Sequence, residues 1–434
     1  MRKDTVKEVI RDFHLESLPQ TRPRDLKVPL NTGKIITLVG VRRAGKSYIL
    51  YETIKDLIRR GIPKERILYI NFEDERLEFN PEDLRLILDA YSELYPHSPI
   101  SECYIFFDEI QNAKGWERFI RRIYDTVTRN IFITGSNSRL LSQDIATSLR
   151  GRTISFEVLP LSFKEYLDFQ GVETNIYHSR TRARIVGLFQ RFLQEGGFPE
   201  LVQISEKTLK LKVLQEYFDV MLYRDMIERF GFRNVAVLKY FLKRIMESVT
   251  TPLSTHKIYN ELKSQGYKVG KGLLYEYLEA AEAASLVLTA RKYSPSVLKQ
   301  ELSAKKAYVV DNGLINAVTV RFSRDFGKLL ENMIFLELRK RGLDRIFFYK
   351  NKRECDFLWV TSEGDQGVIQ VCYDVSDPLT LRREVEGLRQ AGKQAGLSRG
   401  YIVTNEEEDK IETEGFTVEM VPAYKFALGG LKVV

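Results

Sequence analysis

Short apolar runs alternate with longer amphipathic segments over the first 160 residues. Five such runs lie at 35–39, 67–72, 104–108, 131–135 and 153–158. Runs of this length are typical of buried strands, and the segments between them, such as 116–127, carry apolar residues at helical spacing. Strands that alternate with helices predict an α/β fold built on a doubly wound parallel sheet.

Beyond residue 160 the pattern changes. Residues 161–232 have helical spacing, interrupted by EGGFPEL at 195–201. Residues 252–294 predict a helix, a glycine-bearing turn, a second helix and a short strand pair, which is the order of a winged helix-turn-helix. From about residue 321 a helix, a hairpin, a further strand, another helix and a last strand predict a small α/β unit.

One segment has a spacing with a mechanical reason. GVRRAGKS, at 40–47, fits G-x-x-x-x-G-K-[ST], follows a predicted strand and opens a predicted helix. Backbone N–H groups of such a loop surround a phosphate, its lysine reaches the β- and γ-phosphates, and its hydroxyl binds Mg²⁺. We therefore expect ATP and Mg²⁺ as cofactors, with Lys46 catalytic and Ser47 a metal ligand. The residues expected around the phosphates are Gly40, Val41, Arg42, Arg43, Ala44, Gly45, Lys46, Ser47 and Tyr48.

Two further strand ends carry candidate chemistry. Asp108 and Glu109 close the run at 104–108, where an acid holds Mg²⁺ and a following glutamate polarises the attacking water. Ser136 and Asn137 close the run at 131–135. This pair either senses the γ-phosphate or forms a plain polar turn.

Three arginines, Arg139, Arg150 and Arg152, follow the fourth predicted strand. The planar guanidinium suits the charge of a transferring phosphoryl group. We expect a catalytic role for at least one of them, with Arg150 and Arg152 as candidates, in cis or from a neighbouring subunit. The alternative is that they pair with surface carboxylates or bind nucleic acid.

Composition narrows the class of protein. The 434 residues are 44% hydrophobic and 29% charged, with a net charge of +8. No apolar run approaches the roughly 18 residues of a membrane span, so we expect a soluble, cytoplasmic protein without a membrane partner. The three scattered cysteines argue for a reducing compartment, and the four separated histidines give no zinc spacing.

Positive charge gathers in the middle of the chain. Residues 206–300 hold 16 Lys and Arg against 10 Asp and Glu, which points to a polyanion and makes DNA the expected partner. The residues expected to contact it are Lys268, Lys271, Arg291 and Lys292. Glu276 and Glu279 lie on the predicted recognition helix and would repel phosphates, so the alternative is a winged helix used for packing.

The phrases GVRRAGKS, FFDEIQN, GSNSRLLS, LRGR, PLSFKEYL and GGFPE together resemble a family of archaeal and bacterial AAA-type P-loop ATPases with a winged helix and a restriction-endonuclease-like C-terminal domain. The resemblance covers nearly the whole chain. It implies ATP binding, homo-oligomerisation and the handling of DNA or a protein partner. The expected domains are an N-terminal arm at 1–30, an AAA-type core at 31–160, a helical lid at 161–232, a winged helix-turn-helix at 233–300 and the nuclease-like domain at 301–434.

Nucleases of this type hold Mg²⁺ with one acid on a strand and an E-x-K motif a strand later. Asp356 fits the strand acid, and Glu331, on the preceding helix, fits an auxiliary acid. The third element begins with Gln370 and lacks both the acid and the lysine, whose charge Lys350 or Lys352 would have to supply. We therefore expect a degenerate nuclease domain that binds DNA or a partner.

The favoured function is a Mg²⁺-dependent ATPase that couples its nucleotide state to DNA binding. Two alternatives remain open: a nucleotide-dependent switch or scaffold that recruits a protein partner, and an ATP-regulated, structure-specific nuclease.

Overall fold

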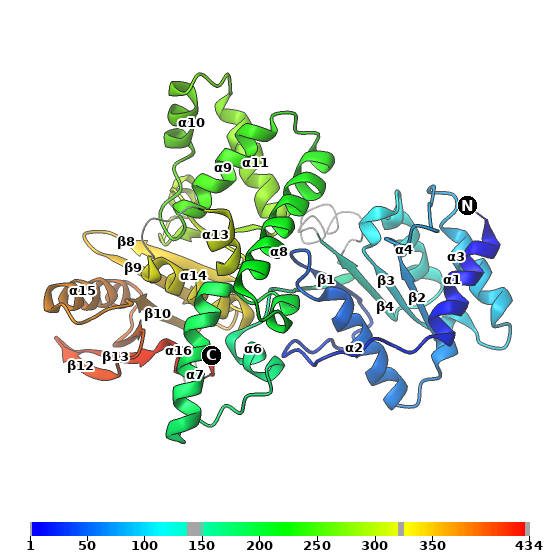
Figure 1. Ribbon diagram of the computed structural model, residues 1–434, viewed down its shortest axis with the longest axis horizontal. Coiled ribbons are helices and arrows are strands. Elements are labelled where there is room, and N and C mark those ends of the chain that lie inside the picture. Colours follow the sequence, from blue (N-terminus) through cyan, green and yellow to red (C-terminus); the bar gives the residue numbers. More distant parts are fainter. Residues whose placement is uncertain (1, 137–148, 150, 320–324, 430–434) are drawn as a thin grey trace. The chain divides into compact units, whose positions relative to one another are not determined.

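The computed structural model describes residues 2–136, 149, 151–319 and 325–429. The chain forms two compact units (Figure 1). One contains residues 1–158 and the short stretch 283–285, and the other contains residues 159–282 and 286–434.

The first unit is built on a five-stranded sheet in the order β2-β3-β4-β1-β5. All four pairings are parallel, which confirms the predicted α/β fold with a parallel sheet. The strands are β1 (Ile35–Val39), β2 (Ile67–Asn71), β3 (Tyr104–Asp108), β4 (Ile131–Gly135) and β5 (Thr153–Glu157). Because all five are parallel, their carboxyl ends share one edge, where ligands of such sheets bind.

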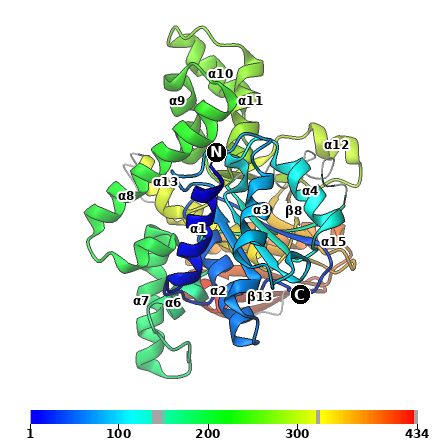
Figure 2. The same cartoon turned by 90° about the vertical axis from the view of Figure 1, so that its right-hand side faces the viewer.

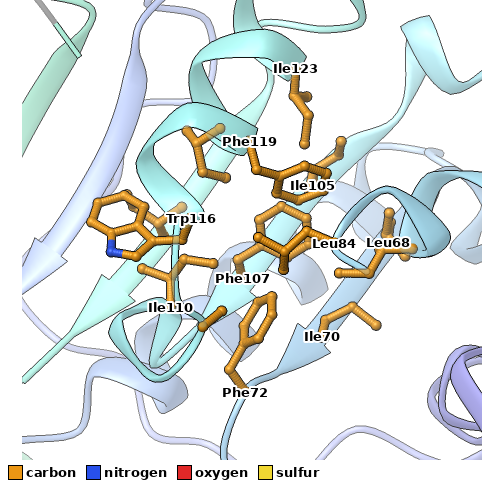
Figure 3. Close-up of a cluster of buried hydrophobic side chains, with 14 of the residues drawn as sticks. Leu68, Ile70, Phe72, Leu84, Ile105, Phe107, Ile110, Trp116, Phe119 and Ile123 are labelled. Atoms are coloured by element: carbon orange, nitrogen blue, oxygen red, sulfur yellow. The ribbon is translucent and has the colours of Figure 1, made fainter. Parts of the chain in front are cut away.

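Helices α2 (Lys46–Arg59), α3 (Arg85–Leu94) and α4 (Trp116–Thr126) connect these strands, with 3₁₀ turns η1 (Lys64–Arg66), η2 (Ile100–Glu102) and η3 (Ile110–Asn112). Successive strand residues point to opposite faces, and one face forms a closed apolar core with α3 and α4 (Figure 3). Its members include Leu68, Ile70, Ile105, Phe107, Leu84, Trp116, Phe119 and Ile123. Each fully buried side chain of this kind contributes about 1.5–3 kcal/mol.

The N-terminal helix α1 (Lys3–Leu15) belongs to the same core. It lies beside α3 (Figures 1 and 2), and Val6, Val9 and Ile10 are buried there. These three positions share one helical face. The expected separate arm at 1–30 is therefore not what the structure shows, because its helix contributes to the packing of the first unit.

The second unit starts with helices, as the sequence predicted. They are α6 (Phe163–Phe169), α7 (Ser179–Glu195), the 3₁₀ turn η5 (Pro199–Gln203), α8 (Lys207–Val220) and the π-helix η6 (Met221–Glu228). The break at GGFPE has a packing reason. The Gly197 N–H donates to Asp311 Oδ2 at 2.6 Å, and a Cβ on Gly196 would lie 2.1 Å from the same carboxylate.

Next come three neighbouring helices, α9 (Val235–Glu247), α10 (Thr255–Ser264) and α11 (Lys271–Ala283) (Figure 1). Ser254 caps α10, as its hydroxyl accepts from the Lys257 N–H at 3.2 Å. The strands β6 (Val287–Lys292) and β7 (Lys306–Val309) pair antiparallel, with α12 (Val297–Leu302) between them.

The last part contains α13 (Asn312–Val318), α14 (Phe326–Lys340), β8 (Arg345–Lys350), β9 (Glu354–Val360), β10 (Gln366–Val371), α15 (Pro378–Gln394), β11 (Arg399–Thr404), β12 (Asp409–Thr413), β13 (Phe416–Pro422) and α16 (Ala423–Ala427). Its strands join β6 and β7 in one eight-stranded sheet, ordered β12-β13-β11-β10-β9-β8-β6-β7. The link is a parallel pairing of β6 with β8. The boundary predicted at residue 300 therefore falls between two paired strands of this sheet.

Candidate nucleotide site

The loop at 40–45 sits at the carboxyl edge of the first sheet and requires its glycines. Gly40 has φ 152°, and a Cβ there would lie 2.1 Å from the Val158 carbonyl oxygen. Gly45 has φ 97° and immediately precedes α2. The close approach at Gly40 and the left-handed backbone at Gly45 both exclude a side chain, so the motif spacing has a steric cause in this fold.

Lys46, the first residue of α2, is 4% exposed. Its ammonium donates to the carbonyl oxygens of Gly40 and Val41, each at 3.1 Å. It also lies 3.6 Å from Glu109 Oε1. The side chain thus folds over the inside of the loop, next to the acid predicted to act on water.

Asp108 ends β3, next to β4, and three side chains act on its carboxylate. The Thr134 hydroxyl donates to Oδ1, the Tyr69 hydroxyl donates to Oδ2 at 3.0 Å, and the nearby Ser47 side chain also lowers the pKa of this carboxyl group. Burial raises the pKa of Asp108, although these hydrogen bonds act in the opposite direction. The two predicted Mg²⁺ ligands, Ser47 and Asp108, thus lie near each other.

Glu109 follows in a left-handed conformation, φ 50°, which is uncommon for a residue other than glycine. Its N–H donates to the Thr134 hydroxyl at 2.8 Å. The Gln111 amide donates to Glu109 Oε2 at 2.5 Å and to the Ser136 hydroxyl at 3.2 Å. Burial acts to raise the pKa of Glu109, but the Lys46 ammonium and the Gln111 amide outweigh it, so the net pKa is lowered. Glu109 is therefore ionised at neutral pH.

Tyr69 and Thr134 take part in the site without belonging to a recognisable motif, and Gln111 lies in the phrase FFDEIQN without having been singled out as a site residue. Tyr69 stands opposite Phe106 in the β2–β3 register, and Phe106 shares a sheet face with Asp108 two residues on. Strand alternation is thus the one sequence signal that could have placed Tyr69 near Asp108. Burial raises the pKa of Tyr69, so its hydroxyl remains a hydrogen-bond donor.

Replacing Tyr69 with phenylalanine should weaken Mg²⁺ binding, so that nucleotide binding requires more Mg²⁺. Asp108 would lose one donor that stabilises its ionised form, at a cost of about 1.5–3 kcal/mol for a hydrogen bond to a charged group. We expect the Mg²⁺ concentration for half-maximal ATP binding to rise by about tenfold or more. Tyr91→Phe is the matched control, because the Tyr91 hydroxyl bonds to the Glu65 carbonyl oxygen, elsewhere in the same unit. Equal behaviour of the two variants would contradict a role for Tyr69.

Other residues in and next to the loop contact groups of the protein or are exposed. Arg42 forms an ion pair with Glu73, Nη1 to Oε1 2.9 Å. Arg43 and Tyr48 are exposed. Arg24, in the extended segment before β1, donates to the Ala44 carbonyl oxygen at 2.8 Å. The N-terminal segment thus contacts the loop itself, which no motif indicated.

Arg152 lies at the other end of the sheet. It directly precedes β5, whose first residue, Thr153, stands opposite Ile35 at the amino end of β1. Its guanidinium binds Asp125 through two hydrogen bonds, of 2.9 and 3.1 Å. A strand of five residues separates it from the loop by about 16 Å, so the expected action of Arg152 in cis is wrong. Its ion pair with Asp125 matches the alternative that these arginines pair with surface carboxylates, and a catalytic role would have to be on a neighbouring copy. Asn137, Arg139 and Arg150 lie outside the described residues.

The residues expected to bind DNA fall into two groups. Lys268 and Lys271 are exposed around the start of α11, and the Lys271 ammonium lies 5.3 Å from the centroid of the Tyr259 ring. Arg291 and Lys292 instead end β6, inside the eight-stranded sheet, and Arg291 is ion-paired with Glu301. The acids Glu276 and Glu279 are exposed on α11, as the sequence indicated.

The structure brings two of the predicted nuclease residues together around a lysine that the sequence did not indicate. Glu331 and Asp356 both contact the ammonium of Lys306, each at 3.0 Å. Gln370 stands beside Asp356 but uses its carbonyl oxygen to accept the Asp356 N–H at 3.0 Å. Lys350 pairs with Glu354 at 2.9 Å. The ammonium in contact with Asp356 is that of Lys306, on β7, while Lys350 and Lys352 line a pocket beside Asp356.

Comparison with known proteins identifies the class. Residues 32–167 match the family model of an AAA domain, and residues 186–325 match a domain of unknown function. The chain is 36% identical over 418 residues to the protein MJ1544 of Methanocaldococcus jannaschii, covering 93% of this chain and 90% of that protein. It is 29% identical over 371 residues to a Haemophilus influenzae protein, covering 85% and 88%.

The chain therefore belongs to the family of MJ1544, a family of proteins with an AAA domain. Among solved structures it is similar to the Aeropyrum pernix Orc1 protein in complex with DNA, with a TM-score of 0.31, 13% identity and coverage of 73% of this chain and 91% of that one. AMPPCP-bound DnaA from Aquifex aeolicus gives a TM-score of 0.26, 13% identity and coverage of 63% and 92%. Likenesses this distant carry no argument about function.

No helix within the described ranges is long and apolar enough to cross a membrane.

Proposed function

We propose that this protein binds and hydrolyses ATP with Mg²⁺ at the carboxyl edge of its parallel sheet. The observation that carries the proposal is the convergence of Lys46, Ser47, Asp108 and Glu109, which come from two separate segments of the chain. The ammonium of Lys46 lies 3.6 Å from Glu109, and the Ser47 side chain is near enough to Asp108 to lower the pKa of that carboxyl group. One site thus contains a cation that can bind phosphate, two oxygen groups that can bind Mg²⁺ and an ionised carboxylate that can polarise water.

The residues present fit Mg²⁺. It favours oxygen ligands, and protein sites for nucleotide-bound Mg²⁺ supply one or two of them, with phosphates and water completing the shell. The Ser47 hydroxyl and the buried Asp108 carboxylate meet this requirement. When bound, Mg²⁺ would neutralise charge that develops on the β- and γ-phosphates.

The chain's own residues would do the rest. Lys46 would exchange its contacts with the Gly40 and Val41 carbonyls for the β- and γ-phosphates. Glu109, kept ionised by its lowered pKa, would polarise the attacking water. Gln111 would fix the direction of that carboxylate through the hydrogen bond it donates to Oε2, and Thr134 would hold the backbone of Glu109 by accepting its N–H.

We further propose that nucleotide state is coupled to DNA binding by the second unit, which would contain a winged helix-turn-helix and a nuclease-like domain without nuclease activity. The basic balance of residues 206–300 and the exposed Lys268 and Lys271 support this proposal. Homo-oligomerisation is part of it, because Arg152 could serve only a neighbouring copy's nucleotide. A switch that recruits a protein partner is the competing function.

One experiment separates these functions: the rate of ATP hydrolysis with and without single-stranded, duplex and branched DNA. Stimulation by DNA, with a binding constant that falls steeply with salt, supports the coupled ATPase, because phosphate neutralisation releases counterions. Slow hydrolysis that DNA does not change supports the switch. No hydrolysis in the presence of Mg²⁺ would contradict the proposal.

Reversing the charge of Lys271 and Arg291 together, to glutamate, should weaken DNA binding. We expect the salt slope of log K to fall by about two units, because two side chains would no longer neutralise a phosphate. A fall of about one unit would assign phosphate binding to Lys271 alone, in keeping with the ion pair that Arg291 makes with Glu301. The measurement is DNA affinity by fluorescence anisotropy at several salt concentrations.

The control is a double variant with the same change in net charge at two other exposed positions, Arg59→Glu with Lys410→Glu. Their side chains are 67% and 63% exposed. ATP hydrolysis without DNA should survive in both double variants. If the two double variants bind DNA equally, the segment of α9, α10 and α11 serves for packing and not for DNA binding.

A further inference from the structure

Lys306 is the most completely surrounded cation in the described part of the second unit. Its residue is 1% exposed, and its ammonium lies 2.8 Å from Glu354 Oε1, 3.0 Å from Glu331 Oε1 and 3.0 Å from Asp356 Oδ1. An ammonium has three N–H donors, and each finds a carboxylate oxygen here. Lys306 is thus fully satisfied by acids from α14 and β9.

Two of these carboxylates, those of Glu331 and Asp356, are the ones that a nuclease of the restriction-endonuclease type would turn toward Mg²⁺. Here other groups engage them as well. Asp356 Oδ2 accepts the Val371 N–H at 3.0 Å, and Glu331 Oε1 accepts from the Tyr308 hydroxyl at 3.1 Å. The oxygen of Gln370 is used by the Asp356 N–H, so it is not directed at a shared metal position.

A divalent cation and this ammonium exclude each other. Mg²⁺ binds oxygens at about 2.0–2.1 Å in an octahedron, whereas Lys306 already holds one oxygen from each of the three acids. Two cations in the same group of carboxylates would also repel strongly in a buried site. Within the described ranges no group of three or more acidic, His or Cys side chains is arranged to hold a metal. The residues therefore do not fit the metal that the resemblance implies.

The charge balance explains why the lysine stays. Burial alone would lower the pKa of Lys306, but the carboxylates, Asp356 foremost, reverse this and hold its pKa well above the ordinary value. Burial and the neighbouring Asp356 raise the pKa of Glu331. The pKa of Glu331 stays raised, to about 8, even beside Lys306, so the lysine offsets the repulsion between the acids in part.

We propose that the ammonium of Lys306 takes the place of the divalent cation of a nuclease-type site. The cluster of Lys306, Glu331, Glu354 and Asp356 (the lysine-filled cluster) then joins β7, α14 and β9 and performs no metal-dependent cleavage. The inference rests on the nuclease-like fold proposed above. It predicts a latent site: without the lysine side chain, the acids should accept a divalent cation. A pocket of about 360 Å³ borders Glu354 and Asp356 and gives such a cation a path from solvent.

The rival role is that of a catalytic lysine in an active nuclease. Such a lysine must reach the water that attacks the phosphate, and it works together with a bound metal. Lys306 is enclosed by three acids and 1% exposed, and it stands where the metal would be. The two roles predict opposite results when the lysine is removed.

The experiment compares the wild-type chain with Lys306→Ala and Lys306→Gln, all in an Asp108→Asn background so that Mn²⁺ at the nucleotide site does not contribute. Mn²⁺ is titrated without nucleotide, and thermal unfolding and the electron paramagnetic resonance of free Mn²⁺ are followed. We expect lower melting temperatures in both variants, restored by Mn²⁺, with one more bound ion per chain than in the wild type. Adding Asp356→Asn to Lys306→Ala should abolish that gain.

The proposal fails if the lysine variants gain no Mn²⁺ binding, or if the wild type binds a Mn²⁺ that Asp356→Asn removes. The comparison of the wild type with Asp356→Asn needs no lysine variant, so it tests the proposal even if the lysine variants do not fold. Equal Mn²⁺ binding by the wild type and Asp356→Asn supports the proposal. Cleavage of branched or single-stranded DNA in Mg²⁺ or Mn²⁺ is measured alongside. Cleavage that disappears in both Asp356→Ala and Lys306→Ala would make Lys306 a catalytic residue and overturn the replacement. Failure of ATP hydrolysis would overturn the proposed function and leave this result standing.

Discussion

Replacing Lys46 with alanine should abolish tight ATP binding. The lysine is the one residue of the loop whose ammonium is buried within it, 4% exposed, and it would be the cationic partner of the β- and γ-phosphates. Removing one member of a buried charge pair costs about 2–5 kcal/mol, which corresponds to about a 30-fold or greater rise in Kd. Isothermal titration with Mg²⁺ and a non-hydrolysable ATP analogue measures the change.

Arg59→Ala is the matched control for Lys46→Ala. Arg59 is also a basic residue of α2, but its side chain is 67% exposed and pairs with Asp56 along the helix. It should leave ATP affinity unchanged. Affinity retained in Lys46→Ala would show that ATP binds elsewhere, and the sheet-edge site would have to be abandoned.

Glu109→Gln should retain ATP binding and lose turnover. Glutamine keeps the size of the side chain but cannot polarise water, and loss of a general base lowers rates by about 10²- to 10⁴-fold. The lowered pKa of Glu109 keeps its side chain ionised through the pH range in which an ordinary glutamate becomes protonated. Glu109 should therefore cause no fall of the wild-type rate in that range. The contribution of Glu109 to the acid limb of the rate profile should lie below that range, whereas the raised pKa of Asp108 acts in the opposite direction. Single-turnover hydrolysis at several pH values measures both effects.

Glu102→Gln tests whether the loss is specific, since Glu102 lies just before the other end of β3, with its side chain 52% exposed. Hydrolysis should be unchanged in this variant. Normal hydrolysis in Glu109→Gln would move the base to another residue. An equal loss of ATP affinity in Glu109→Gln would instead assign Glu109 to nucleotide binding, through its contact with Lys46.

Much of the first unit could be predicted because its signals are local. Five apolar runs became five parallel strands, and the loop motif stands where strand and helix were expected. The contribution of α1 to the core could not be predicted in the same way. Its apolar face at Val6, Val9 and Ile10 shows that the helix packs on something, but the sequence does not say on what.

Less of the candidate sites than of the fold could be predicted from the sequence. Asp108 and Glu109 follow from a motif that also contains Gln111, whereas Tyr69 reaches Asp108 only through the pairing of β2 with β3. The role of Lys306 could not be predicted from the sequence for the same reason. It lies 25 residues from Glu331 and 50 from Asp356, and only the folded arrangement of β7, α14 and β9 brings the three together.

The pairing of β6 with both β7 and β8 has a consequence for anyone who divides this chain for expression. A fragment that ends at residue 300 keeps β6 but lacks both of its neighbours. It exposes two unpaired edges, which recruit other chains and favour aggregation. A fragment that begins at residue 301 keeps β7 without its only partner in the described sheet. The two segments therefore belong to one sheet, and a stable C-terminal fragment has to start before β6.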